Sequence, residues 1–587
     1  MTRRCKMIAA LLLALSIVLP AAAEMPTTQV PLRHWVYDLL DRWETAGHIE
    51  YVFDHTRPYT RREVAAYLDP VFALADSAPE RLTGHDRDWL RYCATEFEAE
   101  LRDAGVLDGP PPATNRFLAV REYGPFRILP DFLYANNRNL AAIERPDFAI
   151  YGDLVAQASR YREVGQGDSV LTTTHLSNGL RFRGGLGERL GFAFMLMDNH
   201  IERDPGFPPL EVFSESGWPY RTIRSDVSLD YNENAAYLTY ADRYVTLMFG
   251  RDYNQWGAGK RGQMMLSTNA PLYDQFKVTV RYGRFKYTHL TAFLQYIEPE
   301  ARRSIKASEN LDVFWSGNRL EVYLGRGVQL GLSESVVYGN QSLDPGYLNP
   351  LAFYKSIEHF NGDRDNGALG ADLAWRVRPG LKVYGELYVD DLTTGKLGSD
   401  WYGNKFGHQA GLFWVDPFRL AGVDLLAEYA RIKPYVYSHT VQDYNKYKHY
   451  DTMLGHAIGP NSDDWFLRLR YAPTRRLRLQ VDWERYRHGG NVRNEAGEVI
   501  RNVGGDADLP FRNGDNPDAV FLDGERVERG ACGGSVQYEL FRHTFLTAQL
   551  HRVTRGGGGS ETSFFLRMSH SFGQRDESVR PFRPAVR

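Results

Sequence analysis

The sequence predicts an all-β transmembrane fold, an outer-membrane β-barrel of about eighteen antiparallel strands with a small N-terminal α-helical region. Three observations predict it: an export signal, a period-two alternation of polar and apolar residues, and long connections that alternate with short ones. The 587 residues include 54 Gly, 35 Tyr and 31 Phe, and 24 % are charged. A barrel fits this composition because only alternate strand residues face lipid, which keeps the mean hydropathy at −0.44.

The first residues have the pattern of a secretory signal peptide. Basic residues precede the apolar run 8–19, and an Ala-Ala-Ala sequence ends at Ala23. The apolar run is too short to cross a membrane as a helix. We therefore expect cleavage of residues 1–23 and delivery of the mature chain to the outer membrane of a Gram-negative cell.

Residues 24–115 are predicted to form a periplasmic helical region. Apolar residues recur at helical spacing over 35–43, and the sequence Thr60-Arg-Arg-Glu63 is a capping box that begins a second helix. A third helix is expected over about 86–102.

Residues 116–572 are predicted to form the barrel, and 573–587 a periplasmic tail. In 465–471 and 477–484, large apolar side chains alternate with polar ones. The side chains expected to face lipid are Leu467, Leu469, Leu477, Leu479 and Val481, and those expected to face the lumen are Arg468, Arg470, Arg478, Gln480 and Asp482.

Connection lengths support the same architecture. Short connections are expected near 185–188, 241–243, 283–284, 316–318, 379–380, 416–421, 472–475 and 541–543. Long connections are expected at 199–221, 252–274, 339–366, 393–405, 433–463 and 488–529. Outer-membrane barrels alternate in this way, with short turns in the periplasm and long loops outside the cell.

The stretch RDYNQWGAGKRGQMML, 251–266, has the glycines and lysine of a phosphate-binding loop. Asn254 stands where the first glycine of that motif belongs, and no helix follows. We interpret it as a long outer loop. Its predicted polysaccharide contacts are Tyr253, Trp256, Lys260 and Arg261, because aromatic faces cover sugar rings and cations pair with acidic groups. The alternative is that the loop packs into the barrel mouth as a plug and contacts no ligand.

This stretch, with YLNPLAFYKSIEHFNGDRDNGALGADL at 347–373 and ELYVDD at 386–391, resembles the capsule assembly Wzi family of outer-membrane proteins. The resemblance implies a protein that attaches capsular or other exopolysaccharide to the cell surface, by binding and without catalysis or a cofactor. It also implies that specificity lies in the loops 199–221 and 488–529.

Two alternatives in other functional classes stay open. The segment that begins at Val30 also resembles a single S-layer homology module, which tethers proteins to cell-wall polymers such as peptidoglycan; this leaves a cell-wall-tethered general porin with an open lumen. An outer-membrane hydrolase is the other alternative. The sequence contains no nucleophile elbow and no H-E-x-x-H zinc spacing, so we predict no catalytic residue.

The remaining partners are predicted from charge and motif spacing. A net charge of −3 argues against nucleic acid as a partner. Outer-membrane lipid is the other expected partner, because the alternating strands predict a lipid-facing outer surface. No metal site is predicted. The sequence NGDRDNG, 361–367, has acidic residues at alternate positions, but Asn366 stands where a calcium loop needs glycine. His439, His449 and His456 match no metal motif and are expected to be solvated.

Overall fold

The computed structural model describes residues 27–107, 115–117, 139–145, 147–164, 170–205, 221–225, 227–296, 311–440, 443–450 and 452–570. The predicted signal peptide and the predicted C-terminal tail lie outside these ranges, as does most of the predicted loop 199–221.

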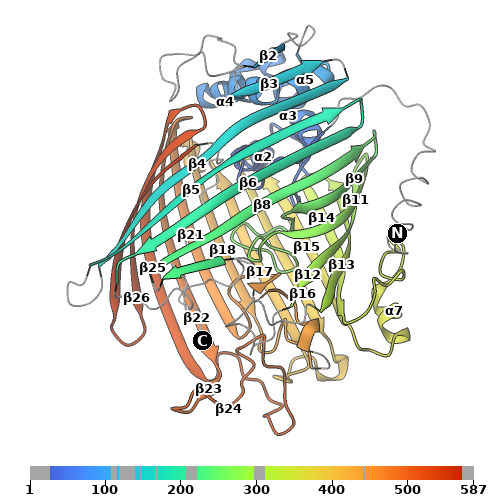
Figure 1. Ribbon diagram of the computed structural model, residues 1–587, viewed down its shortest axis with the longest axis vertical. Helices are drawn as coiled ribbons and strands as arrows, with labels where there is room; N and C mark the ends of the chain where they lie inside the picture. The colour runs from blue at the N-terminus through green and yellow to red at the C-terminus, as the bar shows by residue number, and fades with distance from the viewer. Residues whose placement is uncertain are drawn as a thin grey trace.

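Eighteen antiparallel strands form a closed barrel, as the sequence predicts (Figure 1). They are β4 (Phe148–Val164), β5 (Val170–Leu186), β6 (Leu190–Arg203), β8 (Ser228–Ala241), β9 (Val245–Asp252), β11 (Tyr273–Tyr282), β12 (Phe285–Gln295), β13 (Asp312–Gly325), β14 (Val328–Gly339), β15 (Asn366–Arg378), β16 (Leu381–Asp391), β17 (Lys405–Val415), β18 (Val423–Ile432), β21 (Ser462–Thr474), β22 (Leu477–Gly490), β25 (Glu525–Phe541), β26 (Thr544–Arg555) and β27 (Ser560–His570). Pairing of β27 with β4, which places Ser569 opposite Gln157, closes the ring.

Shorter strands lie beside or inside this ring. They are β2 (Asn115–Phe117), β3 (Ala141–Arg145) and β7 (Arg221–Ser225) at the wall, and the pairs β1 (Thr56–Arg57) with β10 (Gln255–Trp256), β19 (Lys448–His449) with β20 (Thr452–Met453), and β23 (Val492–Arg493) with β24 (Val499–Arg501). The pair β1–β10 joins the helical region to a loop of the barrel.

The predicted alternation along the wall is confirmed on β21 and β22. Leu467, Leu469 and Val481 are 42, 47 and 54 % exposed on the outer surface. Between them, the side chain of Arg468 donates to Asp482 at 2.8 Å on the inner surface. Because successive strand residues face opposite sides of a sheet, one register places the whole apolar set against lipid.

The barrel has a short-turn end and a long-loop end. The connections at the short-turn end are brief, whereas those between β14 and β15, β18 and β21, and β22 and β25 are long. The short connection predicted at 316–318 is wrong, because β13 runs through it and turns only after Gly325. Gly317 serves packing instead: a Cβ there would lie 2.3 Å from the ring of Trp315.

The helical region is a compact unit, which we call the N-terminal domain (residues 27–107). It contains α2 (Val36–Ala46), α3 (Arg61–Ser77), α4 (Gly84–Glu96) and α5 (Glu98–Asp103). The predicted capping box at the start of α3 is present, with Thr60 and Glu63 bonded reciprocally. The expected third helix is divided in two at Phe97, whose backbone leaves the helical conformation. Within the described ranges, no helix has both the length and the apolar character needed to cross a membrane.

The N-terminal domain lies across the short-turn end of the barrel (Figure 1). Its residues bond to strands all around the ring. Only a unit that lies within the lumen can reach all of these strands. These contacts include Gln29 with Tyr237 on β8, Glu63 with Lys286 on β12, Glu44 with Lys382 on β16, Asp38 with Arg470 on β21, and Tyr92 with Glu539 on β25. The domain therefore fills this end of the lumen.

The connection 340–365 departs from the expectation of a loop that projects outward. It contains α7 (Tyr354–Phe360) and packs against the outer surface of β12 to β14. The hydroxyl of Tyr287 donates to the carbonyl of Pro350 at 2.7 Å, and the backbone N–H of Tyr354 donates to Glu334 at 3.0 Å. We call residues 340–365 the external flap. It covers polar wall residues that would otherwise face lipid.

Candidate functional site

The glycine-rich segment 253–272, between β9 and β11, lies inside the barrel. The backbone N–H of Trp256 donates to the carbonyl of Leu266 at 2.8 Å, and the two residues are 0 and 1 % exposed. We call this segment the lumenal loop. The loop joins β9 and β11 at the long-loop end, as the strand count predicts, but it folds into the barrel. This placement favours the plug that the sequence left as the alternative.

Acidic side chains of the wall hold the lumenal loop through its backbone. The N–H groups of Gly259 and Met264 donate to the two carboxylate oxygens of Glu386, at 2.5 and 2.8 Å. Those of Lys260 and Arg261 donate to Glu428, at 2.8 and 3.1 Å. Converging backbone N–H groups form an anion cradle of the kind that phosphate loops use. Here the anions are carboxylates of the protein itself.

The glycines of this loop allow the close approach. A Cβ on Gly257 would lie 2.3 Å from an oxygen of Glu386, and one on Gly259 would lie 1.9 Å from the amide nitrogen of Gln409. Gly257 also has a φ of 136°, which L side chains rarely adopt. The motif GAGKRG therefore reflects packing against the barrel wall.

The four residues predicted to contact polysaccharide have protein partners in this structure. Trp256 packs edge-on against Trp315 at a centroid distance of 5.2 Å. Tyr253 donates to Glu233 at 2.9 Å. Lys260 lies 3.0 Å from Asp41, in the N-terminal domain.

Arg261 is enclosed by the wall of β21 and β22. It lies 2.6 Å from Glu484, and its guanidinium lies 4.0 Å from the centre of the Phe466 ring. Burial alone would lower the pKa of Arg261, but Glu484 and neighbouring carboxylates raise it above the usual value. With Trp256 and Lys260 it forms part of the lumenal packing, and the role of all four residues in ligand binding stays a prediction.

A buried set of charges connects the lumenal loop, the N-terminal domain and the wall. We call it the interior charge network; its members are Asp41, Asp54, His55, Arg57, Lys260, Glu321, Asp372 and Lys382. Asp54 accepts from Lys260 at 3.1 Å and from Lys382 at 3.0 Å. Burial alone would raise the pKa of Asp54, but the two ammonium groups hold it well below its ordinary value.

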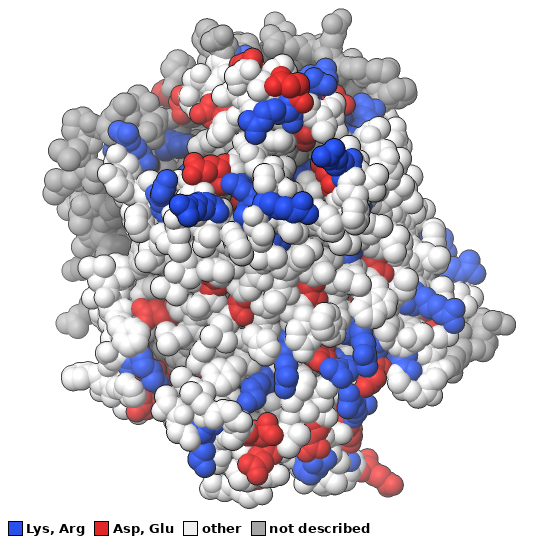
Figure 2. Space-filling model, turned by 180° about the vertical axis from the view of Figure 1, so that it is seen from behind, with Lys and Arg blue, Asp and Glu red and all other residues white. Residues whose placement is uncertain are grey.

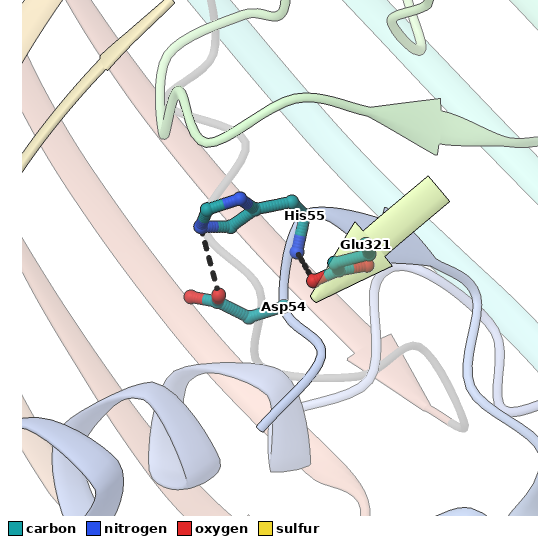
Figure 3. Close-up of side chains that lie close together, drawn as sticks. All are labelled: Asp54, His55 and Glu321. Atoms are coloured by element: carbon teal, nitrogen blue, oxygen red, sulfur yellow. Dashed lines mark hydrogen bonds and ion pairs between the residues drawn. The ribbon is translucent and has the colours of Figure 1, made fainter. Parts of the chain in front are cut away.

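Three members of this network have the ligand types of a metal site. One atom each of Asp54, His55 and Glu321 lies within 4.8 Å of the others (Figure 3). Each already has partners, however: Glu321 accepts from the backbone of His55 at 3.1 Å and from Thr56 at 2.7 Å. His55 Nδ1 lies 2.5 Å from Asp372. The ammonium groups on Asp54 supply the positive charge that a metal would bring, so the geometry supports an ion-pair network.

The connection 433–461, between β18 and β21, folds over the lumenal loop. The hydroxyls of Tyr437 and Tyr447 donate to the carbonyls of Met264 and Met265, at 2.8 and 2.7 Å. The sequence predicts this segment as an outer loop, but much of it is packed in the barrel mouth. Both tyrosines are fully buried.

The predicted solvation of the histidines is wrong for two of the three. His449 and His456 are 2 and 3 % exposed, whereas His439 is half-buried. Burial lowers the pKa of His449 to about 3. Among the residues that the structure describes, the three histidines do not gather into a metal-binding group.

The acidic residues of the sequence 361–367 do not form a gathered set of metal ligands within the described ranges. Asp365 accepts from the hydroxyl of Tyr347 at 2.7 Å, and Asp363 lies 2.7 Å from His359. These carboxylates fix the end of the external flap.

Aromatic side chains from three loops meet at the long-loop end. Tyr402 stacks on Phe511 at 3.6 Å, Trp401 lies 4.5 Å from Tyr402, and Tyr435 packs beneath. We call these four residues the outer aromatic group. Trp401, Tyr402 and Phe511 are partly exposed, and the ammonium of Lys396 lies 4.9 Å from the Trp401 ring. Partly exposed rings beside a cation are chemically suited to a sugar ring with an acidic substituent.

Two of these loops are bonded to each other. The N–H of Tyr402 donates to the carbonyl of Pro517 at 3.0 Å, and that of Ala519 donates to Asp400 at 2.7 Å. The segment 491–524 belongs to the predicted specificity loop 488–529. The sequence predicts no residue of this group; the adjacent aromatics in DWYGN, 400–404, are the local signal that could have indicated them.

The closed barrel, its domain-filled short-turn end and its packed mouth define a plugged outer-membrane β-barrel protein. The sequence profile of the family described as capsule assembly protein Wzi matches residues 177–518. The chain therefore belongs to that family.

A solved structure shows the same barrel fold. Wzi of Escherichia coli, described as a carbohydrate-binding β-barrel involved in group 1 capsule assembly, is 13 % identical, with a TM-score of 0.52, and the match covers 94 % of this chain and 100 % of that one. OprD of Pseudomonas aeruginosa is 9 % identical, with a TM-score of 0.39 and coverage of 72 and 92 %. A comparison with curated protein sequences gave no match.

Proposed function

We propose that this protein binds an extracellular polysaccharide at its long-loop end and holds it on the cell surface, without catalysis. In this proposal the N-terminal domain and the short turns face the periplasm, and the long loops face outward. The observation that carries it is the filled lumen of a capsule-assembly family member. The N-terminal domain is bonded to strands all around the wall and fills one end of the lumen. This arrangement favours a binding protein over a general porin.

The contacts proposed for the polysaccharide lie in the outer aromatic group. Trp401, Tyr402 and Phe511 offer partly exposed rings, and Lys396 and Arg512 offer cations nearby. The family match supports the polymer class, since the Escherichia coli relative is described as carbohydrate-binding. Each such contact contributes on the order of 1–2 kcal/mol when a charge-assisted bond is made.

The experiment compares a double variant, Trp401→Ala with Lys396→Ala, against a matched control, Phe360→Ala with Lys355→Ala. Phe360 is 93 % exposed on the external flap, so the control removes an aromatic ring and a cation away from the proposed surface. Because a polymer binds at many points and masks single losses, affinity is measured by calorimetry with short oligosaccharides from the surface polysaccharide of the producing cell. We expect roughly a tenfold loss in the first variant and no change in the control.

A cellular measurement tests retention itself. Polysaccharide on the cells and polysaccharide shed into the medium are compared between wild type, the double variant and a complete deletion. The proposal predicts shedding in the deletion and partial shedding in the double variant. If the deletion sheds no more polymer than wild type, the attachment function is wrong.

A further inference from the structure

Every short turn in the described part of the barrel carries an arginine. Eight turns join neighbouring strands at this end, and each has an arginine within it or directly before it. These residues are Arg189, Arg243, Arg284, Arg326, Arg378, Arg419, Arg475 with Arg476, and Arg542. The acidic residues of the same turns are Glu188, Asp242 and Asp416. The short-turn end therefore has an excess of positive charge fixed around its circumference.

These arginines lie at the edge of the lipid-facing surface. Exposed apolar side chains flank them in sequence: Leu186 and Leu190 at Arg189, Tyr244 at Arg243, Tyr282 and Phe285 at Arg284, Leu324 at Arg326, Val377 at Arg378, and Phe418 and Leu420 at Arg419. In Figure 2, a row of Lys and Arg side chains lies between the largely uncharged belt of the wall and the end that holds the N-terminal domain. The position is that of lipid headgroups next to a membrane-spanning wall.

Six of the arginines are exposed and have guanidinium groups with no carboxylate partner among the described residues. One is Arg476, beside Arg475; the other five, which we call the turn arginines, are Arg243, Arg284, Arg326, Arg378 and Arg419. Arg243 lies over Tyr244 at 5.2 Å and Arg378 over Trp414 at 5.8 Å, and this stacking keeps these two guanidinium groups at the boundary of the apolar belt. Arg284 lies 5.6 Å from the centre of the Tyr323 ring, which itself stacks on Tyr51 of the N-terminal domain.

Arg475 and Arg542 differ, because they face the N-terminal domain. Arg542 lies 3.7 Å from Glu96, and the guanidinium of Arg475 lies 4.0 Å from the ring centre of Tyr92. The domain thus contacts these two arginines directly, whereas the turn arginines are exposed.

We propose that the turn arginines bind the phosphate groups of anionic phospholipids in the membrane leaflet at the short-turn end. In the cell this proposal rests on the periplasmic orientation given under the proposed function. Guanidinium groups bind phosphate through paired N–H donors, and basic side chains at a membrane surface attract anionic lipids. The apolar residues beside each arginine contact the acyl chains of the same lipids.

The test measures lipid selectivity in symmetric bilayers, where orientation does not matter. Purified protein is reconstituted in phosphatidylcholine, and electron paramagnetic resonance gives the association of spin-labelled phosphatidylglycerol relative to spin-labelled phosphatidylcholine. We expect wild type to favour phosphatidylglycerol, by up to roughly fivefold at sites with one arginine. The variant with all five turn arginines changed to Gln is expected to lose most of this selectivity.

A matched variant controls for the change in net charge. It replaces five exposed arginines toward the long-loop end by Gln: Arg364, Arg493, Arg501, Arg526 and Arg555. This control is expected to keep the wild-type selectivity. Wild-type protein without selectivity, or an equal loss in both variants, would overturn the proposal.

Two further measurements separate other causes. Inorganic phosphate is added at millimolar concentration; if it abolishes the lipid selectivity at constant ionic strength, the turn arginines bind a soluble anion and the lipid proposal is wrong. Circular dichroism and heat-resistant migration on gels establish that each variant retains the folded barrel. Oligosaccharide affinity is measured on the same preparations, so failure of the lipid proposal and failure of the polysaccharide proposal give different results.

Discussion

The ammonium nitrogen of Lys260 lies 3.1 Å from a carboxylate oxygen of Asp54, although the residues are 206 positions apart in the chain. Lys260 belongs to a loop of the barrel, and Asp54 belongs to the N-terminal domain. Both side chains are nearly inaccessible, with 13 and 4 % of their surfaces exposed. This contact makes the loop and the domain parts of one lumenal plug.

Replacement of Asp54 by Asn should destabilise that plug. Lys260 and Lys382 would share a neutral amide in place of a carboxylate, and breaking a buried ion pair costs about 3–5 kcal/mol. Denaturant unfolding in detergent, followed by tryptophan fluorescence, measures the change in the free energy of unfolding. Asp88→Asn is the control, because Asp88 pairs with Arg91 on an exposed surface, where a pair contributes at most about 1 kcal/mol. Equal effects of the two variants would contradict the buried linkage.

His55 should make the stability of the docked domain depend on pH. Burial alone would lower its pKa, but Asp372, Asp54 and Glu321 outweigh burial and raise it above 6.5. A raised pKa in the folded state gives a stabilising contribution that is complete below pH 6.5 and is lost as pH rises through the folded-state pKa.

The measurement compares thermal unfolding of wild type and His55→Gln over a range of pH. The difference in melting temperature should be largest below pH 6.5 and should shrink as the pH rises through the raised pKa. Asp54 has the opposite pH dependence. Because its pKa is lowered, its stabilising contribution is present at neutral pH and is lost only at strongly acidic pH. A difference that grows toward alkaline pH would contradict the assignment.

Gly259→Ala should loosen the lumenal loop. The new methyl group would collide with the amide of Gln409 and the carbonyl of Gly262, and overpacking of this kind costs about 1–3 kcal/mol. We expect wild-type protein in a planar bilayer to conduct little and the variant to open intermittently. Gly395→Ala is the control, because no atom lies within 4 Å of its Cβ position. Identical conductance in wild type and Gly259→Ala would show that this packing does not keep the barrel closed.

Tyr354→Ala should release the external flap. Tyr354 is 2 % exposed, and its hydroxyl donates to the carbonyl of Tyr347 at 2.9 Å. Loss of a large buried aromatic side chain costs about 3–5 kcal/mol, so the flap should become sensitive to protease in detergent. Phe353→Ala, at a residue that is 55 % exposed, should leave its resistance unchanged. Equal cleavage of both variants would mean that Tyr354 does not secure the flap.

The parts of the fold that the sequence predicts are those with local causes. The capping box at Thr60 needs only Glu63, and the alternation from Leu467 to Val481 needs only the two-sided geometry of a strand. The failed turn at 316–318 shows the limit of such reasoning. Gly317 has the local appearance of a turn residue, but it is small because the Trp315 and Trp256 rings fill its space.

The candidate site was predicted less completely. The sequence indicated which loop residues are unusual, including Trp256 and Lys260, but not which side of the barrel mouth they would occupy. Asp41, Asp54 and Lys382 carry no motif, and they become a network only when three distant segments meet. The outer aromatic group likewise depends on contact between 400–404 and 511–519.

The sequence by itself determined the barrel, the helical region before it and the family resemblance, because periodicity and turn spacing are properties of neighbouring residues. Only the tertiary structure decided that the GAGKRG loop turns inward. The backbone N–H groups of this loop, and its cations Lys260 and Arg261, are buried away from water. Their lost hydration is replaced by four carboxylates, those of Glu386, Glu428, Asp54 and Glu484. Those four carboxylates come from segments far apart in the chain, so their meeting is a property of the closed barrel.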